Sequence, residues 1–76
     1  MNKMRRNALD AIRAALEPLM EDLEALKDEE QEAFDNLPEG IQESERGETM
    51  EEAIDNMDTA ISSISDAMDY ILEAIG

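Results

Sequence analysis

Residues 50–75 read MEEAIDNMDTAISSISDAMDYILEAI, and the spacing of their apolar residues predicts a helical fold. It holds a seven-residue repeat with three apolar columns, of which the middle one contains only alanine. The columns are Met50, Met57, Ile64 and Ile71; Ala53, Ala60, Ala67 and Ala74; and Ile54, Ile61, Met68 and Ile75. Steps of three and four residues are typical of a long amphipathic helix and exclude a strand, in which apolar residues would alternate.

The alanine column predicts a close contact with another helix. A row of methyl groups lets another helix approach closely, as in an antiparallel coiled coil lined by alanine. The sequence leaves open whether that close partner is the other helix of the chain or a second copy.

The first half of the chain carries a matching repeat, which predicts a first helix over residues 4–36. The predicted contact positions are Leu9, Ile12, Leu16, Leu19, Leu23, Leu26, Glu30, Ala33 and Leu37, widened by Met20 and Phe34. Pro18 lies on the opposite face and the repeat keeps its phase on both sides of it. We therefore expect Pro18 to kink the helix without ending it, because proline removes one backbone hydrogen bond.

Residues 37–48 are predicted to be a loop, since they include Pro38, Gly40 and Gly47. Thr49 followed by Glu52 has the spacing of a capping box, which predicts a second helix over 49–75. Ser44 is an alternative cap for an earlier start.

The predicted fold class is all-α: one domain, residues 1–76, forming an antiparallel helical hairpin. Each helix offers three apolar positions per heptad, a stripe wider than one partner helix covers. A chain of 76 residues also buries too little surface to be comfortably stable alone. We therefore expect two hairpins to form a homodimeric four-helix bundle.

Composition removes most enzyme chemistry from consideration. The chain has no Cys and no His, and so lacks a thiolate nucleophile, the commonest general base and the usual zinc ligands. No nucleophile and base pair, metal-ligand spacing or cofactor motif is visible, so we expect a protein that is not an enzyme and has no metal or cofactor. Glu30 is the one acid in the predicted contact stripe, where it would need Lys27 or Arg46 as a partner.

Charge is the most informative feature for function. The formal net charge is −15, from 21 acidic and 6 basic residues, with the bases concentrated in the first thirteen residues. This excess disfavours direct binding to nucleic acid or anionic membranes and favours a basic protein partner. The predicted partner-binding acids are Glu17, Glu21, Glu24, Asp28, Glu29, Glu32, Asp35, Glu48, Glu51, Glu52, Asp55 and Asp58.

The segment DEEQEAFDNLPEGIQESERGETMEEAI, residues 28–54, resembles short uncharacterised acidic proteins encoded by phages and mobile elements of Gram-positive bacteria. The alanine and isoleucine heptads after it are similar to theirs too. Small acidic phage proteins are often stoichiometric inhibitors of host defence, including anti-CRISPR and anti-restriction proteins that imitate nucleic-acid charge. The resemblance therefore implies an origin but no mechanism and no site residue, and the class of activity is an analogy that does not depend on the fold.

Two hypotheses follow. In the first, the chain is a non-catalytic cytoplasmic inhibitor whose carboxylates block a basic groove of a host nucleic-acid-handling protein. In the second, the heptads serve self-assembly, the chain is a structural or adaptor coiled coil, and its acidity confers only solubility. No stretch is apolar enough to predict a signal peptide or a membrane span.

Overall fold

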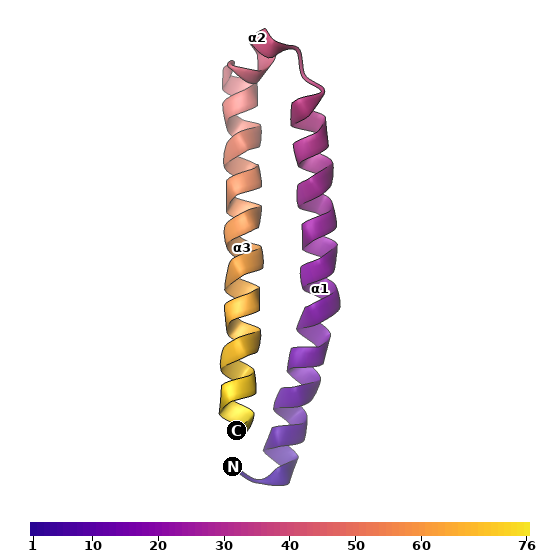
Figure 1. Cartoon of the computed structure of the whole chain (residues 1–76), viewed down its shortest axis with the longest axis vertical. Helices are drawn as coiled ribbons and strands as arrows, with labels where there is room; N and C mark the ends of the chain where they lie inside the picture. Colours follow the sequence, from indigo (N-terminus) through magenta and orange to yellow (C-terminus); the bar gives the residue numbers. More distant parts are fainter.

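The computed structural model describes all 76 residues, Met1–Gly76, and contains three helices and no strand. α1 spans Lys3–Asp35, α2 spans Glu39–Gln42 and α3 spans Glu45–Ile75. α1 and α3 run antiparallel side by side, α2 closes one end, and both termini lie at the other (Figure 1). The prediction of an all-α chain with two long paired helices is confirmed.

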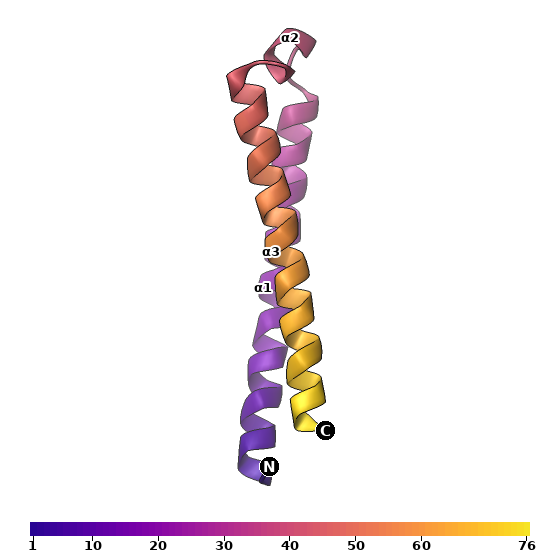
Figure 2. The ribbon, with the colours of Figure 1, turned by 90° about the vertical axis from the view of Figure 1, so that its left-hand side faces the viewer.

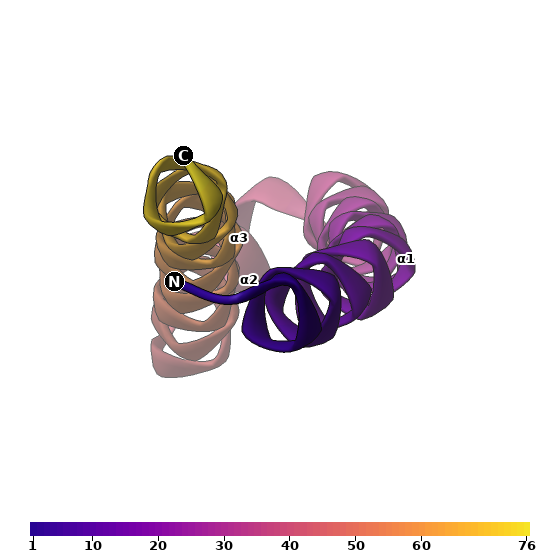
Figure 3. The ribbon, with the colours of Figure 1, turned by 90° about the horizontal axis from the view of Figure 1, so that it is seen from below.

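The hairpin is a rod one helix thick. Its Cα atoms extend 58 × 15 × 12 Å along the principal axes. The two long helices cross at a shallow angle (Figure 2). The view along the rod shows α1 and α3 side by side, with α2 at the far end, and no other element covers either broad side of the pair (Figure 3).

α1 begins at Lys3, one residue before the predicted start, and continues through its proline. The Asn2 side chain accepts a hydrogen bond from the backbone N–H of Arg5 at 2.8 Å, which satisfies one of the free donors of the first turn. Pro18 lies near the middle of α1 on its exposed side, and the helix is unbroken there. Figure 1 shows α1 bowed, with its convex side away from α3, the curvature expected when a proline removes a bond on the outer side.

The connection between the long helices is shorter than predicted. α3 begins at Glu45, four residues before the predicted start at 49, with Ser44 in the N-cap position. Thr49 does not form a capping box, because its hydroxyl donates to the carbonyl of Glu45 inside the helix at 2.9 Å. Residues 39–42 of the predicted loop form α2.

Gly47 explains the tight turn into α3. It is buried, and a Cβ atom at this position would lie 2.0 Å from the backbone oxygen of Gln42. The Gln42 side chain in turn donates from Nε2 to the carbonyl of Phe34 at 3.0 Å, near the end of α1. The absence of a side chain at Gly47 therefore lets α2 pack onto α3 while Gln42 caps α1.

The contact between α1 and α3 follows two columns of each helix. On α1 the buried or half-buried residues are Leu9, Arg13, Leu16, Met20, Leu23, Lys27, Glu30 and Phe34, and Leu37 continues this spacing beyond the helix. On α3 they are Gly47, Met50, Ile54, Met57, Ile61, Ile64, Met68, Ile71 and Ile75, together with Ala60. We call this contact the seam. Only Ile54 and Met68 form its fully buried apolar core.

Part of the predicted contact stripe lies outside the seam. Ile12, Leu19 and Leu26 are 52%, 58% and 56% exposed, and their predicted places are taken by Arg13, Met20, Lys27 and Phe34. Ala33, Ala53, Ala67 and Ala74 are exposed as well, and Ala60 is half-buried. On α3 the reason is size, because the Met and Ile columns bury more apolar area than the alanine column would. On α1 the stems of Arg13 and Lys27 add apolar area beside Met20 and Phe34.

We predict that Gly47→Ala destabilises the hairpin by about 1–3 kcal/mol, because the new methyl group meets backbone that cannot rotate away. Thermal or urea unfolding followed by circular dichroism measures this. Gly40→Ala is the matched control: nothing lies within 4 Å of its new Cβ, so its stability should be unchanged or slightly higher. Equal stability of the two variants would contradict the packing described here.

Candidate functional site

One broad side of the hairpin collects carboxylates from both long helices. On α1, Glu17 and Glu24 come one turn after Arg13 and Met20 of the seam; on α3, Glu51 comes one turn after Gly47. The two helices face each other and run in opposite directions, so the columns that follow the seam lie on the same side of the pair. We call this side the acidic face, made of Glu17, Glu21, Glu24, Asp28, Asp35, Glu48, Glu51, Asp55 and Asp58, all exposed.

Direct contacts tie the two halves of the acidic face together. The Lys27 Nζ atom lies 2.8 Å from Oδ1 of Asp58, which is the one ion pair of the chain. Further along, Gln31 and Phe34 of α1 border the same hollow as Glu51 and Asp55 of α3. The acids of α1 and α3 therefore form one surface.

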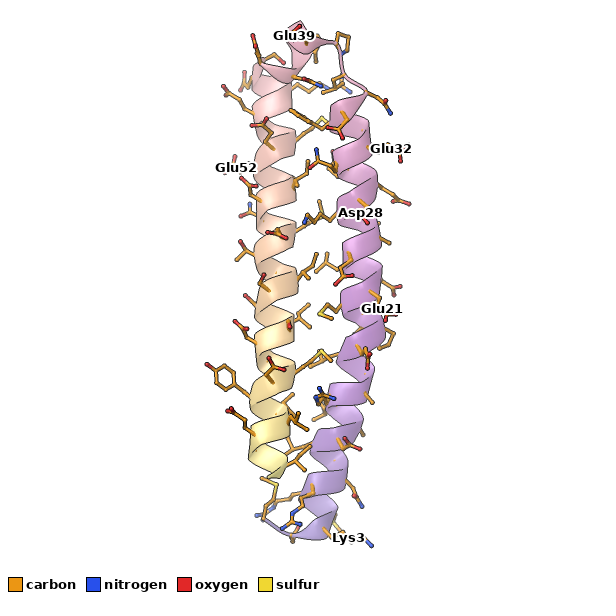
Figure 4. The ribbon with its side chains drawn as sticks, in the orientation of Figure 1. Lys3, Glu21, Asp28, Glu32, Glu39 and Glu52 are labelled. Carbon is orange, nitrogen blue, oxygen red and sulfur yellow. The ribbon has the colours of Figure 1, made fainter.

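Three of the predicted partner-binding acids lie outside the acidic face. Glu32 and Glu52 are on the outer edges of the hairpin, pointing away from each other, whereas Glu21 and Asp28 project from its acidic side (Figure 4). Glu29 comes one turn before Ala33 and belongs to the opposite side of α1. The structure thus brings nine of the twelve predicted acids together.

The hollow on the acidic face was not visible in the sequence. It has a volume of about 250 Å³ and is lined by Gln31, Phe34, Glu51, Ile54 and Asp55. Its apolar floor comes from Phe34 and Ile54, and its rim carries two carboxylates. That combination suits a long cationic side chain, whose stem packs on apolar atoms while its charged end meets the acids. Only the pairing of α1 with α3 creates it, since Phe34 and Ile54 are twenty residues apart.

The cations of the seam are used within the chain. Arg13 donates from Nε to the carbonyl of Met68 at 3.1 Å. The hydrogen bond to Asp58 raises the pKa of Lys27 above its ordinary value of 10.5, and the nearby Asp28 and Glu24 charges act in the same direction. Lys27 therefore stays charged while neutralising one acid of the acidic face.

We predict that Asp58→Asn lowers the pKa of Lys27 toward 10.5, because it removes the largest cause of the shift. A pH titration of the lysine side chain followed by NMR measures this. The sign of the linkage is fixed by the raised pKa: the stability contributed by this pair is present below pH 10.5 and is lost as pH rises through the pKa of the folded state. A Lys27 pKa that is the same in the variant and the parent chain would contradict the pairing.

Glu30 is half-buried in the seam, as expected, but neither Lys27 nor Arg46 forms an ion pair with it. No group of three acidic side chains lies close enough together to hold a metal ion. None of the helices combines the length and apolarity that a membrane crossing requires.

The opposite broad side of the hairpin is apolar. Ile12, Leu19 and Leu26 come one turn before seam residues of α1, and the alanine column comes one turn before seam residues of α3. We call this side the apolar face, made of Ile12, Leu19, Leu26, Ala33, Ala53, Ala60, Ala67 and Ala74. Three alanines of the column, Ala53, Ala67 and Ala74, are exposed on this side and only Ala60 reaches the seam, so the column does not form the main contact with α1.

Comparison of the chain with protein-family models, with characterised proteins and with solved structures gave no match.

Proposed function

We propose that the chain is a non-catalytic interaction protein whose acidic face occupies a basic groove of a nucleic-acid-handling protein. The observation that supports this most directly is the gathering of nine exposed carboxylates from two helices on one side of the hairpin. In this proposal the protein is a phage-type stoichiometric inhibitor that acts in the host cytoplasm, in the manner of anti-CRISPR or anti-restriction proteins.

The charge density of the acidic face supports this choice of partner. With about 1.5 Å of rise per residue, its nine acids span roughly 30 Å, or one charge per 3–4 Å. One strand of DNA carries one phosphate per about 3.4 Å of helix axis. A groove that binds a nucleic-acid backbone would therefore meet a similar linear density of negative charge.

The hollow beside Phe34 adds a point of anchorage to this surface. An arginine or lysine of the partner could place its stem against Phe34 and Ile54 and its charge between Glu51 and Asp55. Buried cationic anchors of this kind contribute most to binding when neighbouring contacts exclude water. Charge complementarity over the rest of the face would speed association and would weaken with salt.

A second candidate function is a self-assembling structural or adaptor protein, and the exposed apolar face favours it. In both cases we propose that two hairpins associate into a four-helix bundle. The candidates differ in whether the acidic face binds a partner or only keeps the assembly soluble.

We predict that the triple variant Asp28→Asn, Glu51→Gln, Asp55→Asn binds its partner about tenfold more weakly or worse, because it removes charge around the hollow. The measurement is capture of proteins from a host-cell lysate on the immobilised chain. Captured proteins are identified by mass spectrometry, salt is varied, and duplex DNA is added as a competitor.

The matched control is Glu29→Gln, Glu32→Gln, Glu52→Gln, which makes the same change in net charge outside the acidic face. Capture should persist in this control, fall with salt, and fall when DNA competes. Equal capture by both triple variants would favour the structural candidate. Capture that is indifferent to salt or DNA would rule out imitation of nucleic-acid charge.

A further inference from the structure

We propose that the apolar face is the surface through which two copies of this chain associate. The inference rests on the proposed pairing of hairpins, but it does not depend on the identity of any other partner. It assigns the interface to Ile12, Leu19 and Leu26 of α1 and to the alanine column of α3, and leaves the acidic face outside.

The area that a single hairpin exposes supports this assignment. The chain exposes 5623 Å². A compact monomer of 8.5 kDa would expose about 4,700 Å², so the hairpin has roughly 900 Å² in excess. A specific dimer buries about 800 Å² per partner. The excess is therefore what one such interface would cover.

The distribution of charge explains why a second copy would dock on this side. Each chain carries a net charge of −15, so two copies repel each other wherever acids meet. The apolar face contains no acid, and the next column of α3 holds the uncharged Thr49, Asn56, Ser63 and Tyr70. Asp22 and Glu29 border the face only on α1. It is the broad side on which two such acidic chains approach with least repulsion.

The shape of the apolar face is self-complementary. Counting outward from the Lys27–Asp58 pair places Leu26 within one residue of Ala60 along the axis, and Leu19 within one residue of Ala67. A ridge of large side chains thus lies beside a furrow of methyl groups. A two-fold axis would set the ridge of each copy against the furrow of the other, as an interface between identical surfaces requires.

The first test is the mass of the purified chain in solution, measured by analytical ultracentrifugation over a range of concentrations. We expect a mass twice that of the 8.5 kDa chain. Leu19→Glu with Leu26→Glu should weaken the dimer by at least about 100-fold, because it buries unpaired charge. The control Leu72→Glu replaces a leucine of similar exposure, 52%, that flanks the seam on the acidic side, and it should leave the dimer intact.

A second test does not depend on a disruptive variant. The chain has no cysteine, so a single one can be introduced at an exposed position of α3. The thiol of Ala67→Cys, on the apolar face, should be alkylated at least tenfold more slowly when the protein is concentrated than when it is dilute. The thiol of Ser65→Cys, on the acidic side of the same helix, should react at one rate throughout.

A monomeric mass at every concentration would overturn the proposal. So would a dimer that survives the paired glutamates while retaining its helical circular dichroism, or one that Leu72→Glu disrupts equally. Concentration-dependent protection of Ser65→Cys and not of Ala67→Cys would place the interface on the other side. Because these measurements use the chain alone, their outcome does not depend on the result of the capture experiment.

Discussion

Two helices can bury only one seam between them, and the rest of this structure depends on that constraint. On α3 two of the three apolar columns enter the seam and the alanine column is left outside it except at Ala60; on α1 the column of Ile12, Leu19, Leu26 and Ala33 is left outside. Even within the seam Ile54 and Met68 are the only buried apolar side chains, and each keeps 7% of its surface exposed. The fold of a single chain is therefore complete in its backbone hydrogen bonds but poor in buried apolar area, which is the term that normally offsets the entropy of folding.

The helical class could be predicted from the sequence, whereas the choice of seam columns could not. Leu9, Leu16 and Leu23 recur every seven residues, so they belong to the contact whichever neighbouring column enters the seam with them. Hydrophobicity alone then favours Ile12 and Leu19 over Arg13 and Lys27 as their neighbours. The decisive information is the reach of the long cationic side chains to the Met68 carbonyl and to Asp58, which exists only once α3 is in place. The sequence favours Thr49 over Ser44 as the cap of α3 for a similar reason, since Gly47 is typical of a helix breaker until Gln42 packs against it.

The sequence predicts which acids are candidates for binding, but not which of them share one side of the hairpin. Acids surround α1 on several sides, so a list drawn from the sequence includes Glu29 and Glu32 together with those that share one face. Which acids share one side depends on the orientation of each helix, and the seam fixes that orientation. The hollow between Phe34 and Ile54 depends in addition on the register of the pair, which no local pattern encodes.

The closed end of the hairpin has a consequence for how the chain folds. Gln42 joins the end of α1 to the start of α3 through neighbours in sequence, so contacts there close the shortest loops and cost the least entropy. Contacts near the termini join residues more than fifty positions apart, as Arg13 and Met68 illustrate. We therefore expect the helices to zip from the turn toward the open end and to fray in the reverse order. Amide exchange that was slowest at the termini would show that assembly starts elsewhere.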